Sequence, residues 1–129
     1  MTRTAFALAV LFSATSFAPA GKFNKTLSVG DAAPAWEGLE GTDGKKHALA
    51  DLKEKDVVVV VFTCNSCPVA VGYEARLLDF AAKHAAADSK VAVVAINVNT
   101  IKDDALPAMK ERAAKKKYPF PYLYDPSQQ

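Results

Sequence analysis

The chain has 129 residues, of which 50% are hydrophobic and 23% are charged, and this size and composition fit one globular domain rather than two. Its formal net charge of +2 is too small to indicate nucleic-acid binding. Two cysteines are too few for a disulfide-dense small protein or for a four-cysteine zinc site. Two cysteines are nevertheless enough for a single functional pair.

The first 20 residues differ from the rest and have the features of a secretory signal peptide. Arg3 supplies a positive charge, Ala5–Phe12 is an apolar run, and Ala18-Pro19-Ala20 has the small–x–small form of a cleavage site. The apolar run is too short to cross a bilayer, which needs about 20 residues. A buried N-terminal helix is the alternative. We expect residues 1–20 to be a signal peptide and 21–129 to be the exported domain, periplasmic or secreted.

The exported part begins with features of an extended segment followed by a hairpin. Pro34 disfavours helix in the residue before it, and Trp36 is expected to anchor the core. The Asp43-Gly44 pair lies between apolar flanks and predicts a hairpin within residues 39–46. Residues 48–52 are expected to form a short helical turn or loop that leads into the core.

Two apolar runs then predict the centre of the fold. Val57–Phe62 (VVVVVF) and Val91–Val98 (VAVVAINV) show no polar alternation, which is typical of strands buried on both faces of a parallel sheet. Between them, apolar residues at spacings of three and four predict a helix over residues 68–87.

A second helix is predicted after the second strand. Asp103 and Asp104 are candidate caps, Pro107 is tolerable only in the first turn, and the helix should reach Lys117. Strand, helix, strand and helix form a βαβα unit with a parallel sheet, so the fold class is α/β. Phe120–Tyr124 predicts the approach to another strand.

The two cysteines, Cys64 and Cys67, follow the first predicted strand and precede the first predicted helix. A helix N-terminus presents unpaired N–H groups and partial positive charge, which favour a thiolate over a thiol. Pro68 suits a first helical turn because its missing N–H would have no helical partner there. We expect Cys64 to be exposed, to have the lowered pKa and to attack, and Cys67 to be more buried and to resolve the mixed disulfide.

Three interpretations of this pair are open. A structural disulfide closing so short a loop would stabilise the fold little. Two thiolates can hold Cu(I), which would make the chain a copper-delivery protein. A zinc site would need more ligands, and His47 and His84 are each expected to be ordinary surface residues. Thiol–disulfide exchange by Cys64 and Cys67 is the preferred interpretation, and it requires neither a metal nor another cofactor.

The sequence resembles the exported thioredoxin-like redoxins that share a domain with alkyl hydroperoxide reductase and thiol-specific antioxidant. The similarity extends from about Leu27 to the end of the chain. It is carried by SVGDAAPAW (28–36), GKKHALADL (44–52), FTCNSCP (62–68), AINVN (95–99) and YPFPYLYD (118–125).

This resemblance implies a thioredoxin-like fold with an N-terminal hairpin extension, with Cys64 as the attacking and Cys67 as the resolving cysteine. It also implies disulfide-containing protein substrates and a thiol electron donor. The small net charge argues against a nucleic-acid partner, and the short apolar run argues against stable membrane insertion. The final strands and helix of that fold have no counterpart here, so we expect the domain to be incomplete at its C-terminus. Peroxide reduction is a further alternative, although the threonine expected three residues before a peroxidatic cysteine is replaced by Cys64 before Cys67, and by Val61 before Cys64.

Overall fold

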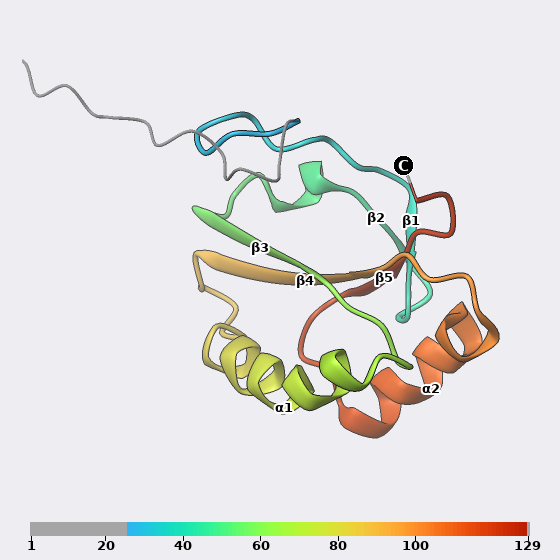
Figure 1. The fold of residues 1–129 in the computed structure, drawn as a ribbon. Coiled ribbons are helices and arrows are strands. Elements are labelled where there is room, and N and C mark those ends of the chain that lie inside the picture. Colours follow the sequence, from blue (N-terminus) through green and yellow to red (C-terminus); the bar gives the residue numbers. More distant parts are fainter. Residues whose placement is uncertain (1–25, 129) are drawn as a thin grey trace, which may run out of the picture. The chain divides into compact units, whose positions relative to one another are not determined.

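Residues 26–128 are described by a computed structural model, shown in Figure 1. The predicted signal peptide and the predicted mature N-terminus at Gly21 lie outside the described residues. The chain divides into one unit that ends at Pro34 and a second that begins at Ala35. In the described part of the first unit, the Ser28 backbone N–H donates to the Asp31 carboxylate at 2.6 Å.

A five-stranded sheet forms the frame of this unit, in the order β2-β1-β5-β4-β3. The strands β3, β4 and β5 are parallel, whereas β1 runs antiparallel to both β2 and β5. The predicted βαβα unit with parallel strands is therefore confirmed. The strands are β1 (Leu39–Gly41), β2 (Lys46–His47), β3 (Val57–Phe62), β4 (Val91–Asn97) and β5 (Tyr122–Tyr124).

The N-terminal hairpin is confirmed and is joined to the parallel strands by β5. Leu39 pairs with His47 across the hairpin, and Glu40 pairs with Tyr124 of β5. Because β5 has a partner on each side, its side chains are deeply buried: Tyr122 is 1% exposed and Leu123 is 0% exposed. The predicted short helical turn after the hairpin is the 3₁₀ helix η1 (Leu49–Leu52).

Strand β3 corrects one prediction. We expected both apolar strands to be buried on both faces, and β4 is, but β3 lies at the edge of the sheet and pairs only with β4. Val57 is 50% exposed and Phe62 is 70% exposed. A run of β-branched residues is compatible with a central or an edge strand, and the number of neighbours, which the run does not encode, decides its burial.

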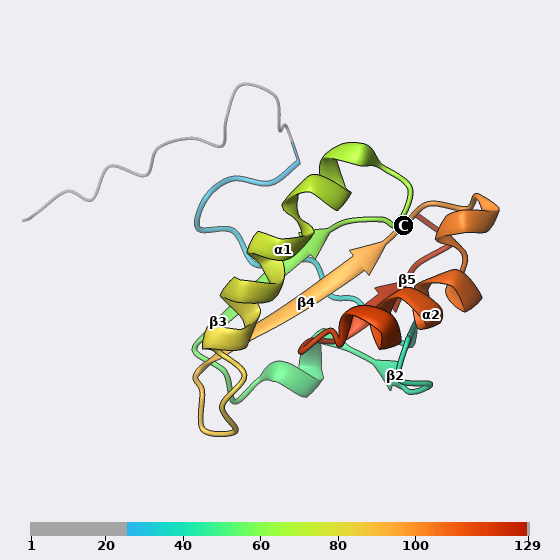
Figure 2. The same ribbon diagram turned by 90° about the horizontal axis from the view of Figure 1, so that it is seen from below.

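Two helices cover one face of the sheet (Figures 1 and 2). Helix α1 (Pro68–Lys83) lies beside β3 and β4, and helix α2 (Leu106–Lys116) lies beside β5. Helix α1 ends four residues before the predicted position, because the chain after His84, its C-cap, turns back toward β4.

The start of α2 corrects a second prediction. Its N-cap is Ala105, and neither Asp103 nor Asp104 caps it; both belong to a separate 3₁₀ helix, η2 (Lys102–Asp104). Pro107 does lie in the first turn of α2, where it needs no hydrogen-bond partner.

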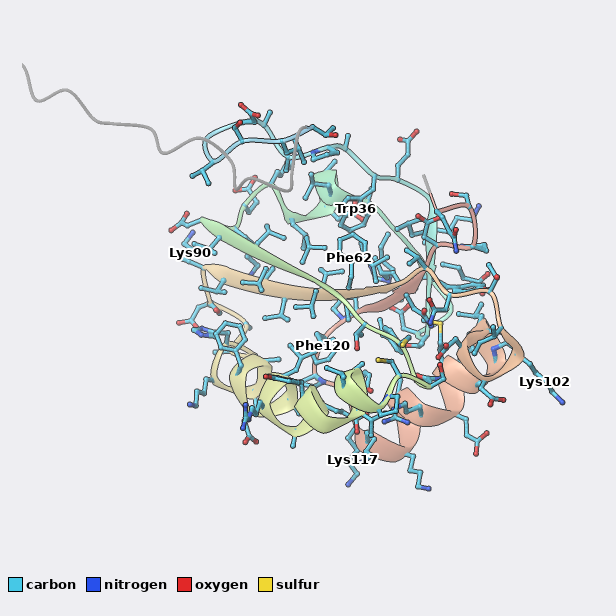
Figure 3. The ribbon with its side chains drawn as sticks, in the orientation of Figure 1. Trp36, Phe62, Lys90, Lys102, Lys117 and Phe120 are labelled. Carbon is cyan, nitrogen blue, oxygen red and sulfur yellow. The ribbon has the colours of Figure 1, made fainter. Side chains whose placement is uncertain are left out.

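The sheet separates two apolar clusters. Between sheet and helices, Met109 and Tyr122 pack with Ala81 and Phe120, and on the opposite face Trp36 packs against Val94, Ile96 and Leu123. Figure 3 shows Phe120 and Trp36 on these opposite sides. Within residues 26–128 no helix is long and apolar enough to cross a membrane.

Candidate active site: a thiol pair at the start of α1

The two cysteines lie in the short connection between the end of β3 and the start of α1. Cys67 is the N-cap of α1, with φ −71° and ψ 119°, and Pro68 follows in the first turn. The Cys67 carbonyl accepts the Val71 N–H at 2.9 Å, which closes that turn. Cys64 and Cys67 are both free thiols and both partly buried.

The helix N-terminus acts on Cys67. The backbone N–H groups of Ala70 and Val69 lower the pKa of the Cys67 thiol, and the Cys64 thiol adds a further hydrogen bond, while partial burial and the negative charge of Asp104 oppose them. Cys64 and Cys67 are both partly buried, so the assignment of Cys64 as the exposed attacking thiol and Cys67 as the buried resolving thiol stays a prediction. Cys67 occupies the N-cap of α1, next to the partial positive charge of the helix N-terminus, although its side chain makes no capping hydrogen bond within residues 26–128.

The two residues between the cysteines are held by a carboxylate that is distant in sequence. Asp104 Oδ1 accepts the backbone N–H of Asn65 at 2.6 Å and of Ser66 at 2.9 Å. Its other oxygen, Oδ2, accepts the Ser66 hydroxyl at 2.6 Å and the Asn99 side-chain amide at 2.9 Å. Asp104 is 0% exposed. One buried carboxylate thus binds both residues that separate the thiols.

Asn65 makes further hydrogen bonds to neighbouring elements. Its side-chain amide donates to the Asp103 carbonyl at 3.0 Å, and its side-chain oxygen accepts the Tyr122 hydroxyl at 3.2 Å. Its backbone carbonyl accepts Arg112 Nη1 at 3.5 Å. Burial raises the pKa of Tyr122, so this phenol stays protonated and donates. The connection is therefore tied to η2, α2 and β5.

The end of β4 supports the same arrangement. Asn97, which is 0% exposed, donates its side-chain amide to the Asp104 carbonyl at 2.8 Å and accepts the Asn99 N–H at 2.9 Å. These bonds place η2 beside the cysteines, because the carboxyl ends of the parallel strands β3 and β4 meet at one edge of the sheet.

An ion-pair cluster joins the two helices behind the site. Glu74 of α1 accepts Arg112 Nε at 2.7 Å, the Tyr118 hydroxyl at 2.5 Å and Lys116 Nζ at 3.1 Å. Burial alone would raise the pKa of Glu74, but these three donors outweigh it and lower the pKa to about 2. Burial and the Glu74 carboxylate together raise the pKa of Tyr118 to about 12. Glu74 is therefore ionised, and Arg112 connects it to the cysteine-bearing turn.

An open apolar groove extends from the cysteines along β3 and α1. It encloses about 670 Å³. Its walls are mostly aliphatic and aromatic, with Glu74 and Arg76 as the charged members. The apolar lining includes Val59, Val61, Phe62, Val69, Tyr73, Leu77 and Phe80. An apolar segment of another molecule could contact both sulfur atoms from this groove.

The histidines lie away from the thiols. His47 pairs with Asp43 at 3.1 Å in the hairpin, and the ring of His84 packs on Phe80 with centroids 5.0 Å apart. No group of three or more metal-ligating side chains occurs among residues 26–128. A metal held here would have Cys64 and Cys67 as its protein ligands.

Sequence reasoning found the two cysteines and missed the residues that hold them. The sequence pattern predicts Asp104 as a helix cap and assigns no role in the site to Asn65, Asn99 or Tyr122. One signal was present: Asn97 and Asn99 are polar residues at the end of an otherwise apolar strand, adjacent in the sheet to the strand before the cysteines.

Residues 29–129 match the AhpC/TSA family. The chain belongs to this family. No protein with a curated description matches the sequence.

Solved structures agree on the fold. The chain is similar to a hypothetical protein from Sinorhizobium meliloti, with 32% identity and a TM-score of 0.69, over 75% of this chain and 53% of that one. A putative protein disulfide isomerase from Bacteroides thetaiotaomicron has 25% identity and a TM-score of 0.61, over 78% and 59%. A thiol:disulfide interchange protein of the thioredoxin family from Chlorobium tepidum has 26% identity and a TM-score of 0.58, over 72% and 59%.

These matches confirm the predicted thioredoxin-like fold and the redoxin family. The chain spans between about half and three fifths of the length of these three structures. Two of these three are described as proteins of thiol–disulfide chemistry.

Proposed function

We propose that this chain is a thiol–disulfide oxidoreductase in which Cys64 and Cys67 exchange with a disulfide of another molecule. The observation that carries the proposal is the position of Cys67 at the N-cap of α1, where N–H groups of the first turn stabilise its thiolate beside a second thiol. Thiolates are the reactive form in exchange, and a neighbouring thiol is needed to release the product.

The proposed reaction begins with the Cys67 thiolate. Its sulfur attacks one sulfur of the substrate disulfide, forms a mixed disulfide and expels the other substrate sulfur as a thiolate. Cys64 then loses its proton and attacks Cys67, which forms the Cys64–Cys67 disulfide and releases the second substrate thiolate. The substrate gains two electrons and the pair loses two. A thiol electron donor returns the pair to the dithiol state, and the reverse sequence oxidises a dithiol substrate.

This order of attack differs from the one that the family resemblance implies, in which Cys64 attacks first. We assign the first step to Cys67 because it occupies the N-cap of α1, where the partial positive charge of the helix N-terminus favours a thiolate. The roles of the two thiols can be separated by experiment because each can be removed alone.

We propose that the substrates are proteins with accessible disulfides and apolar flanking residues. The groove beside the thiols supports this proposal, since its lining of valine, leucine and aromatic side chains suits an apolar segment rather than a charged small molecule. The signal-peptide features of residues 1–20 support action outside the cytoplasm, in the periplasm or after secretion, where disulfides persist.

The test is trapping of mixed disulfides by single-cysteine variants. Cys64→Ser and Cys67→Ser are incubated at pH 7 with a peptide that contains one disulfide, and adducts are resolved by mass spectrometry with and without a reducing agent. We expect Cys64→Ser to accumulate a reducible adduct on Cys67, Cys67→Ser to form several-fold less, and the wild type to release both peptide thiols.

Each other outcome has a defined meaning. More adduct on Cys67→Ser than on Cys64→Ser would return the first attack to Cys64 and leave exchange intact. No adduct on either variant, together with one tightly held Cu(I) per reduced wild-type chain, would replace exchange by copper delivery. Rapid consumption of hydrogen peroxide with a sulfenic acid on Cys67, and no reaction with the peptide, would favour peroxide reduction.

A further inference from the structure

Asp104 is the buried carboxylate nearest to the thiol pair, and its surroundings are unusual for a charged group. Its oxygens accept four hydrogen bonds, all from neutral donors of Asn65, Ser66 and Asn99. No lysine, arginine or histidine among residues 26–128 forms an ion pair with it. A buried charge without a partner of opposite sign costs stability unless its hydrogen bonds are complete.

The carboxylate is nevertheless ionised at neutral pH. Burial by itself would raise the pKa of Asp104, but the hydrogen bonds from the Ser66 hydroxyl, the Asn99 amide and the two backbone N–H groups outweigh burial and hold the pKa below its usual value of 3.8. A full negative charge therefore lies directly behind the residues that join Cys64 to Cys67.

This placement has two consequences for the thiols. First, the Asn65 and Ser66 N–H groups both donate to Asp104, and neither has a backbone acceptor within residues 26–128. Second, the same charge opposes the Cys67 thiolate that the N–H groups of Val69 and Ala70 stabilise. Asp104 thus orders the turn and at the same time limits how far the reduced form is stabilised.

We propose that Asp104 is a positioning residue that holds the Asn65–Ser66 turn between the thiols and biases the pair toward its disulfide, making the dithiol a stronger reductant. This inference rests on the proposed exchange function. Its chemical basis is that a dithiol whose thiolate is less stabilised gives up its two electrons more readily, and stabilising the reduced form makes a pair more oxidising.

The test compares Asp104→Asn with a matched control, Asp103→Asn. Both variants replace a carboxylate by an amide of equal size, one residue apart, but the Asp103 side chain is exposed and forms no ion pair with any residue that the structure describes. Each full-length protein is equilibrated in buffers of defined ratio of reduced to oxidised glutathione. The fraction of Cys64–Cys67 disulfide is then measured by alkylation and mass spectrometry.

We expect Asp104→Asn to shift the equilibrium toward the dithiol by roughly three- to tenfold, which for a two-electron couple is about 15 to 30 mV, and Asp103→Asn to match the wild type. A purely structural Asp104 would lower the melting temperature without this directed shift. An Asp104→Asn variant that melts cooperatively but keeps the wild-type equilibrium, or moves toward the disulfide, overturns the proposal.

A second measurement needs no variant. Amide hydrogen exchange by NMR should show the Asn65 and Ser66 N–H groups of the reduced wild type protected by at least tenfold, although they belong to a turn. Exchange at the rate of an unprotected turn overturns the proposal even if Asp104→Asn fails to fold. A wild-type pair that never forms a disulfide in any glutathione buffer refutes the exchange function and with it the role of Asp104. If the wild-type pair forms its disulfide and Asp104→Asn has the same equilibrium between dithiol and disulfide, only the role of Asp104 is refuted.

Discussion

Protonation of Glu74 should weaken the fold, because this carboxylate joins α1 to α2 through Arg112, Tyr118 and Lys116. The pKa of Glu74 is about 2 in the folded chain, against 4.5 for a glutamate without these partners. Each pKa unit corresponds to about 1.4 kcal/mol, so ionised Glu74 contributes about 3 kcal/mol to the free energy of unfolding. The side chain of Glu74 is 10% exposed, so solvent screens little of this interaction.

The sign of the pH dependence follows from the direction of the change. A carboxyl whose pKa is depressed by folding stabilises the fold fully above its unfolded pKa, and the contribution is lost as the pH falls toward the folded pKa. For Glu74 the loss begins near pH 4.5 and is nearly complete at pH 2. A contribution of about 3 kcal/mol is a large share of the 5–15 kcal/mol that stabilises a typical domain.

The assay is urea unfolding of the wild type and Glu74→Gln across this pH range. We expect Glu74→Gln to be less stable by about 3 kcal/mol at pH 6 and nearly equal to the wild type at pH 2. Glu111→Gln is the matched control, because Glu111 is an exposed residue of α2 that has no ion pair in the described part of the chain, and it should have little effect at either pH. A Glu74→Gln effect that is the same at both pH values, or no larger than that of Glu111→Gln, would refute the reasoning.

Three shorter predictions concern export, the sheet edge and the core. N-terminal sequencing of protein exported by a bacterial host should start at Gly21, and a chain that starts at Met1 would contradict the signal peptide. The exposed edge of β3 and the neighbouring groove should bind a hydrophobic dye and promote self-association. Val60→Lys, on the edge strand, should reduce light scattering, and unchanged scattering would show that the chain does not self-associate through β3. Met109→Ala should lower the free energy of unfolding by roughly 2–5 kcal/mol, since Met109 is 0% exposed; a loss below about 1 kcal/mol would contradict its central place in the core.

The elements that the sequence predicted well depend on local signals. Repeated β-branched residues located β3 and β4, the Asp43-Gly44 pair located the hairpin, and apolar spacing located α1 with an error only at its C-terminal end. Each signal lies within one element, and its physical cause acts over a few residues.

The predictions that failed depend on neighbours that are distant in sequence. Whether Val57–Phe62 is central or at an edge depends on which strands pair with it. Whether Asp104 caps α2 or binds the cysteine-bearing turn depends on where η2, which follows β4, lies relative to the cysteines.

The bonds from Asp104 also bear on the order in which the chain folds. Asn65 and Asp104 are 39 positions apart, so the cysteines are synthesised well before the residue that orders the turn between them. Contacts of such separation form after local ones, because a long loop must first close. A growing chain that has passed Cys67 but not Asp104 carries both thiols on an unrestrained turn. In the oxidising compartment that we propose for this chain, the thiols would have an interval in which wrong disulfide partners compete, and this interval would end when η2 docks.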